Sequence, residues 1–114
     1  MPTQRMRQIN SVLREYFATA FMRLVELPPG VVVSVTKVHT TADLHYCTVF
    51  LSIVPDDQAG STLQLIRRHT VGIIEDVVDH ITFRAVPRFR FMIDDTERKA
   101  AQIEQLLDSL PKIE

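Results

Sequence analysis

The sequence predicts an α+β sandwich in which a three-stranded sheet carries its helices on one face. Apolar residues recur at three- and four-residue steps in three stretches of the chain, a spacing typical of amphipathic helices. Two β-branched segments, residues 31–38 and 45–53, are separated by a short turn and are expected to pair as an antiparallel hairpin. An alternating segment, residues 82–93, is expected to form the third strand.

Composition places the chain among ordinary globular domains. Of its 114 residues, 46% are hydrophobic and 24% are charged, so one domain spanning residues 1–114 with a sizeable core is expected. The single cysteine, Cys47, excludes an internal disulfide and a thiolate metal cluster, and it fits a reducing, cytoplasmic setting. No apolar run reaches the roughly 20 residues that span a bilayer, so no membrane partner is expected.

The first helix is predicted over residues 3–26. Its apolar stripe ends before the Pro-Pro-Gly segment at residues 28–30, because proline removes a backbone donor and restricts the residue before it. An arginine-containing, acid-poor start is also typical of a mitochondrial presequence, but the stripe continues to Val25, which favours a helix of the folded domain. The basic residues off the stripe, which are expected to face water or a partner, include Arg5, Arg7 and Arg14.

A second helical stretch follows the hairpin after a short loop. Ser61 or Thr62 is expected to cap it, and the helical spacing continues to Ile81. The spacing falters at residues 67–72. Because a glycine inside a helix costs about 1 kcal/mol relative to alanine, Gly72 predicts a kink or two helices that meet there.

The third predicted strand separates its aromatic residues from its basic ones, since alternate side chains of a strand point to opposite faces. The aromatic set is Phe83, Phe89 and Phe91. The basic set is Arg84, Arg88 and Arg90. Pro87 removes one donor from the ladder, so an edge position or a bulge is expected. Asp94 and Asp95 then precede a last helix, residues 96–110, which Pro111 ends.

The sequence contains no recognisable catalytic or metal-binding constellation. Its histidines are scattered, and none has a cysteine or carboxylate at the spacing of a known metal or triad motif. Cys47 lies among aliphatic residues and is expected to be a small core residue rather than a nucleophile. We therefore expect no enzyme activity, cofactor, metal or small-molecule substrate, which leaves binding as the predicted function.

Positive charge gathers locally although the formal net charge is −1. Basic residues cluster on the first helix, before the kink and on the third strand, and Lys37 on the first strand could join one of these clusters. Each cluster is also typical of an ordinary solvated face. At the kink, however, free N–H groups and the dipole of the following helix attract anions. Arg67 and Arg68 beside it therefore favour a surface for RNA phosphates.

Several of these segments together resemble the ribosome-binding factor A family. The segments that carry the resemblance are Arg5 and Arg7 before the Ile9–Leu13 helix, Asp43-Leu44-His45-Tyr46 running into Val49, Gly72 followed by Ile73-Ile74, Phe83-Arg84 with Pro87, Phe89 and Phe91, and finally Asp94. They are spread over almost the whole chain. The D-L-x-Y and F-R-x-x-P-x-F-x-F pieces are specific when they occur together in this order.

The resemblance implies a KH-like fold of the second type, in which two helices meet at an Ala-x-Gly kink and the usual G-x-x-G loop is absent. Thr70-Val71-Gly72 stands at that place, so a threonine replaces the alanine. Family members tend to be basic, whereas this chain is slightly acidic. The resemblance also implies a non-catalytic role: binding the free 30S subunit and its 16S rRNA, assisting late rRNA processing, and supporting growth in the cold.

We therefore expect a monomeric domain that contacts rRNA. The expected contact residues are Arg5, Arg7, Lys37, Arg67, Arg68, Thr70, Gly72, Arg84, Arg88 and Arg90. The sequence leaves open an alternative, a protein-interaction module of the same fold without direct RNA binding. Such a module would use the exposed sheet or the last helix, because residues 92–114 carry three basic and six acidic side chains.

Overall fold

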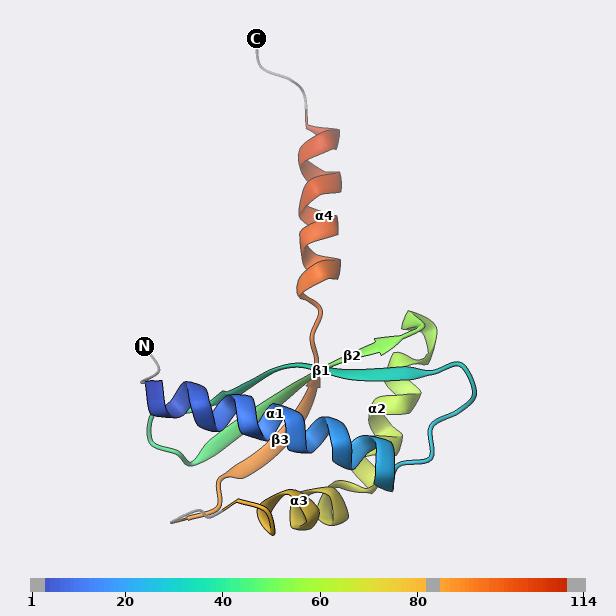
Figure 1. Ribbon diagram of the computed structural model, residues 1–114. Coiled ribbons are helices and arrows are strands. Elements are labelled where there is room, and N and C mark those ends of the chain that lie inside the picture. Colours follow the sequence, from blue (N-terminus) through green and yellow to red (C-terminus); the bar gives the residue numbers. More distant parts are fainter. Residues whose placement is uncertain (1–3, 82–84, 111–114) are drawn as a thin grey trace.

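The computed structural model of the protein describes residues 4–81 and 85–110 (Figure 1). Within these ranges the helices and strands follow the predicted order, and a short 3₁₀ turn precedes the second helix. The elements are α1 (Gln4–Leu24), β1 (Val32–Thr40), β2 (Tyr46–Val54), η1 (Asp56–Gln58), α2 (Ala59–Arg68), α3 (Thr70–Val78), β3 (Arg88–Ile93) and α4 (Thr96–Ser109).

The three strands form one mixed sheet in the order β1-β2-β3. Strands β1 and β2 pair antiparallel, as predicted, whereas β2 and β3 pair parallel. The parallel pair requires a crossover connection, which α2 and α3 supply. The third strand is at an edge of the sheet, as Pro87 predicted, but it begins only after that proline, at Arg88. The predicted start at residue 82 is wrong for residues 85–87, and residues 82–84 lie outside the described ranges.

One face of the sheet, called here the inner face, is buried under the helices. It carries Val35, Val38, Cys47, Val49, Leu51, Ile53 and Phe91. Helix α1 packs on this face through Leu13, Phe17, Ala20 and Phe21, and α2 and α3 add Ile66, Ile73 and Val77. Phe17 meets Phe89 and Phe91 edge-on, with ring centroids 5.3 and 5.7 Å apart. The predicted α+β sandwich is therefore confirmed, and its core lies between the inner face and these three helices.

The predicted interruption of the second helical stretch is confirmed. Helix α2 ends at Arg68 and α3 begins at Thr70, because His69 departs from helical geometry with φ −99° and ψ 11°. Gly72 lies within the first turn of α3, and a Cβ added there would meet nothing within 4 Å. The break is therefore at His69 and not at the glycine. The predicted cap is wrong, because α2 begins at Ala59 and Ser61 and Thr62 lie inside it.

Each of the two edge strands of the sheet, β1 and β3, accepts a hydrogen bond from an arginine of a neighbouring helix. On β1, the carbonyl oxygen of Val35 accepts a hydrogen bond of 3.0 Å from Arg14 Nε of α1. On β3, the carbonyl oxygen of Phe91 accepts one of 3.1 Å from Arg67 Nη2 of α2. Arg14 was expected simply to face water or a partner, and its bond to Val35 was not anticipated.

Helix α4 extends away from the sheet and continues the direction of β3 (Figure 1). Its predicted apolar stripe is present, but the stripe is exposed; it consists of Ala100, Ile103, Leu106, Leu107 and Leu110. The Asp94 carboxylate holds the start of the helix: Oδ1 accepts the backbone N–H of Thr96 at 3.0 Å, and Oδ2 accepts the hydroxyl of Thr36 from β1 at 2.6 Å. Within the described part of the chain, no helix is both long and apolar enough to cross a membrane.

Candidate nucleic-acid interface

The junction of α2 and α3 borders an open groove along the free edge of β3. The groove has a volume of about 400 Å³ and is lined by Arg67, Thr70, Phe89, Arg90, Phe91 and Met92. Two arginines that are far apart in the sequence therefore border one cavity. The hydroxyl of Thr70 donates to the carbonyl oxygen of Arg67 at 2.7 Å, which ties the first residue of α3 to the end of α2.

The other predicted residues of the kink do not line this groove but are exposed to solvent. Arg68 and Gly72 are exposed, and His69 makes no side-chain cap on α3. The first N–H groups of a helix have no acceptor within their own helix, and they carry the positive end of its dipole. The uncapped first turn of α3 can therefore accept an anion next to Arg67.

The opposite face of the sheet, called here the outer face, carries the predicted basic residues of β1 and β3. Arg88 and Arg90 alternate with the inward-facing phenylalanines of β3, as predicted. Arg90 Nε donates to the Thr48 hydroxyl at 2.9 Å, which fixes the base of its guanidinium group. Lys37 lies on the same face, with its Nζ 4.6 Å from the centroid of the Phe50 ring. Arg90 lines the groove as well, so the outer face adjoins the groove at this residue.

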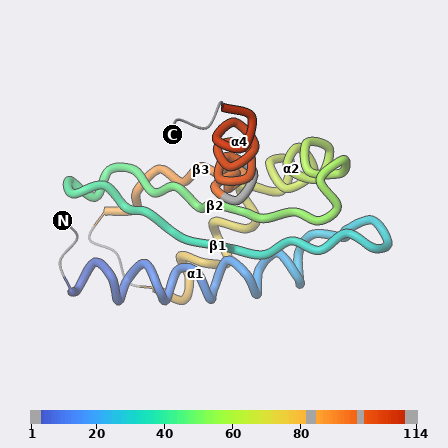
Figure 2. The backbone as a smooth tube through the Cα atoms, turned by 90° about the horizontal axis from the view of Figure 1, so that it is seen from above, coloured from blue at the N-terminus to red at the C-terminus, as the bar shows by residue number. Residues whose placement is uncertain are grey.

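Two of the predicted basic residues do not join this surface. Arg5 and Arg7 are exposed near the N-terminal end of α1, and Figure 2 places that end and α2 at opposite ends of the molecule. Arg5 instead lines a separate depression of about 310 Å³ with Gln8, Ile9, Val12 and Ile81. Arg84 lies outside the described residues, so its predicted role stays a prediction.

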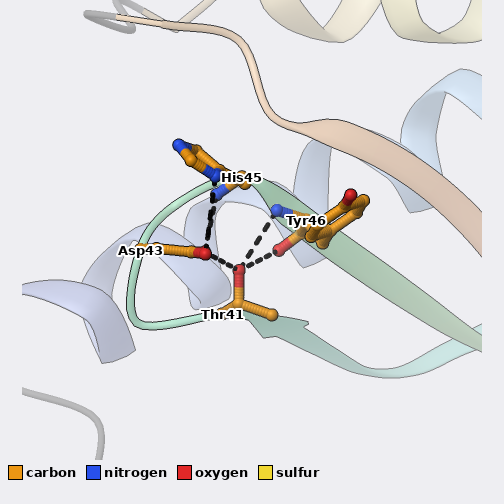
Figure 3. Close-up of polar contacts among 4 residues, drawn as sticks. All are labelled: Thr41, Asp43, His45 and Tyr46. Carbon is orange, nitrogen blue, oxygen red and sulfur yellow. Dashed lines mark hydrogen bonds and ion pairs between the residues drawn. The ribbon is translucent and has the colours of Figure 1, made fainter.

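The D-L-x-Y segment forms the turn between β1 and β2 (Figure 3). Asp43 Oδ1 accepts the Thr41 hydroxyl at 2.6 Å and the backbone N–H of His45 at 3.0 Å, so Thr41 first, and then His45, hold the pKa of Asp43 below its ordinary value. Leu44 adopts a left-handed φ of 62°, which its N–H bond of 2.9 Å to the Thr41 carbonyl accommodates. These bonds fix the backbone at the start of β2 while Tyr46 stays 51% exposed.

Sequence reasoning missed the residues that organise this surface. Thr36 occupies an irregularity of β1 between Val35 and Lys37, and its hydroxyl reaches Asp94. The bond from Thr36, followed by those from Thr96, lowers the pKa of Asp94 to about 2. Alternation along a strand cannot predict this contact, because the irregularity shifts the register by one residue.

The remaining chemistry of the described residues is that of a folded core. Cys47 is fully buried, and burial raises the pKa of its thiol to about 11, which agrees with the predicted core role and disfavours a reactive thiolate. Among residues 4–81 and 85–110, no three His, Cys, Asp or Glu side chains are close enough to hold a metal ion.

The fold and this surface define a small α+β binding domain, whose candidate site consists of exposed cations beside a broken helix. Comparison with known proteins then identifies the family. The family model described as ribosome-binding factor A matches residues 5–107, and the chain belongs to the ribosome-binding factor A family.

Relatives with the same description match the chain over nearly its whole length. A ribosome-binding factor A of Protochlamydia amoebophila is 32% identical, over 98% of this chain and 87% of that protein. One of Flavobacterium johnsoniae is 33% identical, over 94% of this chain and 85% of that protein.

Solved structures confirm the fold. The crystal structure of ribosome-binding factor A from Thermus thermophilus aligns with a TM-score of 0.65 at 16% identity, over 76% of this chain and 93% of that one. The solution structure of a Thermotoga maritima protein described as a putative ribosome binding factor A aligns with a TM-score of 0.67 at 18% identity, over 81% and 89%. Membership of this family makes the chain a ribosome-associated factor, and the family is named for binding to the ribosome.

Proposed function

We propose that this protein is a non-catalytic assembly factor that binds the free 30S subunit through its 16S rRNA and assists late rRNA processing and subunit maturation. It acts in the cytoplasm as a monomer, without a cofactor, and its role includes growth in the cold. Family membership supports the ribosome as the target. The proposal goes beyond family membership in three respects: the small subunit as the target, the contact with 16S rRNA, and the role in rRNA processing.

The observation that carries this proposal is the groove shared by Arg67 and Arg90. Arg67 belongs to the helix layer and Arg90 to the outer face, yet both line the same cavity of about 400 Å³. Two guanidinium groups beside an uncapped helix start match the donors that bind phosphate backbones. A chain with a net charge of −1 then binds through a local patch, since overall attraction to RNA is weak.

Gly72 fits the same use. It is exposed in the first turn of α3, and the space around its Cα is open. Without a Cβ, the backbone N–H groups of this turn can approach a phosphate oxygen closely. Gly72 therefore acts through its missing side chain, while Arg67 and Arg68 supply charge.

Cosedimentation with purified ribosomal particles tests the proposal. The protein is expected to pellet with free 30S subunits and not with 70S ribosomes. A double substitution, Arg67→Ala with Arg90→Ala, is expected to lose the 30S particle while the circular dichroism spectrum is retained. The matched control is Arg5→Ala with Arg7→Ala, which removes equal charge far from the groove. Equal binding to 30S and 70S particles would contradict the proposal.

A second candidate function rests on the exposed stripe of α4. Ile103, Leu106, Leu107 and Leu110 are each more than half exposed, at the spacing of a helix that docks in a groove of a partner protein. Salt separates the two functions. RNA binding should weaken with a log–log slope of roughly −0.7 per phosphate contact on single strands, whereas docking of apolar side chains should be almost independent of salt.

A further inference from the structure

The half of the outer face next to the β1–β2 turn combines cations with an open aromatic ring. None of residues 32–40, 46–54 and 88–93, which form the three strands, is acidic. Two carboxylates flank this half, and both already accept hydrogen bonds. Asp43 in the turn accepts from Thr41 and His45. Asp94, at the other end, accepts from Thr36 and Thr96. We call this half the cationic platform; it consists of Lys37, His39, Tyr46, Phe50, Arg88 and Arg90.

Tyr46 is the aromatic side chain of the platform that is free to stack. The residue is 51% exposed, and its backbone is held on both sides, since its N–H donates to the Thr41 hydroxyl at 3.1 Å and its carbonyl accepts the Thr41 N–H at 2.9 Å. Binding then need not order the backbone, and tyrosine has only two side-chain torsions to fix, so covering the ring costs little entropy. Phe50, in contrast, is half-buried and already covered by Lys37.

Two arginines of the neighbouring strand β3 lie next to Tyr46 in the register of the sheet. Arg88 is the register partner of Tyr46 in the parallel pair of β2 and β3, so their side chains leave the same face of neighbouring strands. Arg90 follows on that face, about 7 Å further along the strand. The bond from its Nε to Thr48 fixes the group, and its terminal nitrogens keep their donors for a ligand.

This combination fits unpaired nucleotides better than duplex RNA. Bases in a duplex stack on one another and cannot stack on a side chain, whereas unpaired bases stack on aromatic rings while arginines bind their phosphates. The carboxylate-free strands favour an anionic ligand, although the chain as a whole is slightly acidic.

We infer that the cationic platform is a binding site for single-stranded RNA, in which one unpaired base stacks on Tyr46 and Arg88 and Arg90 bind the adjoining phosphates. The inference rests on the proposed rRNA-binding function and specifies its target as an unpaired segment. It also adds a surface on the side of the sheet that faces away from α1.

A tryptophan substitution makes the stacking visible, because the chain has no tryptophan of its own. Tyr46→Trp places the only indole on the platform, and an octauridylate should quench its fluorescence in a saturable way. A blunt RNA duplex of the same charge should quench it far less. The matched control is Tyr16→Trp on α1, where the native ring packs 5.2 Å from the ring of His80; its fluorescence should not respond to RNA.

Truncation measures the contribution of the ring. Stacking of one base on an aromatic side chain is worth roughly 1–3 kcal/mol, so Tyr46→Ala should weaken octauridylate binding by about 5- to 150-fold. Tyr46→Phe, which keeps the aromatic ring, should bind octauridylate about as tightly as the wild type. Thermal unfolding of both variants should match the wild type, since the ring is exposed, and that match separates a binding defect from misfolding.

Three results would overturn the inference. Equal quenching by duplex and single strand would assign the platform to backbone contacts alone. Quenching of Tyr46→Trp by poly-glutamate to the same extent as by octauridylate would assign it to an acidic protein. Unchanged octauridylate affinity in Tyr46→Ala would remove the stacking role. If the wild type still pellets with 30S subunits in these cases, the proposed function survives; if the wild type does not pellet at all, that function fails independently of Tyr46.

Discussion

The two faces of the sheet are built from the same strands but have opposite chemistry. On β3, the inward Phe91 is 2% exposed and packs edge-on against Phe17 and Phe21, whereas its neighbour Arg90 points outward and lines an open groove. Two adjacent residues of one strand therefore have different roles: Phe91 packs in the core, and Arg90 is proposed to bind RNA. We therefore expect substitutions at these adjacent positions to affect stability and binding separately.

The largest expected contrast lies within β3. Phe91→Ala should lower the free energy of unfolding by about 3–5 kcal/mol, because it removes a fully buried ring and leaves a cavity. Arg90→Ala should change it by about 1 kcal/mol or less but should weaken binding to 30S subunits. Urea denaturation and cosedimentation of both variants measure the two effects. If Phe91→Ala were as stable as Arg90→Ala, the division between the faces would be wrong.

A smaller effect is expected where α4 joins the outer face. Asp94→Asn should lower stability at neutral pH by about 1 kcal/mol, since the carboxylate accepts several hydrogen bonds at a partly exposed site. The pKa of Asp94 is lowered from 3.8 to about 2, so its contribution is complete above pH 3.8 and is lost as the pH falls towards 2. Wild type and variant should therefore converge in acid, as followed by urea denaturation at several pH values.

Asp95→Asn is the matched control for this experiment. Asp95 is 46% exposed and pairs with Lys99 at 3.4 Å on the surface of α4, and such pairs contribute little. A pH dependence that is the same in Asp95→Asn and Asp94→Asn would assign the effect to general charge instead of the Thr36 contact.

The two neighbouring arginines at the end of α2 sharpen the comparison further. Arg67→Ala should cost about 1 kcal/mol of stability, because its guanidinium group donates to the Phe91 carbonyl oxygen. Arg68→Ala should stay within about 0.5 kcal/mol, as is usual for exposed residues. Both should reduce affinity for 30S subunits. Thermal melts that rank the two variants in the reverse order would contradict the role of Arg67 at the sheet edge.

Substitution of Gly72 is expected to raise stability instead of lowering it. Gly72→Ala should stabilise the fold by up to about 1 kcal/mol, since the added Cβ meets nothing within 4 Å and alanine is the better helix former. It should nevertheless weaken binding, because the methyl group stands over the first turn of α3. Gly60→Ala in α2 is the control: its surroundings are equally open, so it should stabilise without affecting binding.

Local patterns predicted much of this molecule. Helical spacing predicted α1 and the α2–α3 break, and alternation along β3 predicted that Phe91 points inward and Arg90 outward. The parallel pairing of β3 was beyond sequence reasoning, because it depends on how the crossover helices pack and not on the strand itself. The exposure of α4 was also unpredictable, since an apolar stripe is the same whether or not a partner covers it.

The candidate site was predictable in its parts but not in its assembly. Arg67 and Arg90 were expected as separate clusters, and only the packing of α2 beside β3 brings them to one groove. Arg5 and Arg7 have the same charge and are exposed, yet the length of α1 carries them to the other end of the molecule. Alternation along β2 places the Tyr46 ring on the outer face, and the turn bonds of Thr41 and Asp43 fix its backbone there.

The hydrogen bonds from Arg14 and Arg67 to the two edge strands affect how readily the protein can associate with itself. A free strand edge is a template on which another chain can pair, and it is a common route to aggregation. Here Arg14 holds a carbonyl of β1 and Arg67 holds one of β3, so an incoming strand must first displace a guanidinium group from each edge. A short sheet with only three strands can thereby keep both borders closed to its own copies, even though the described residues provide no further strands to shield them.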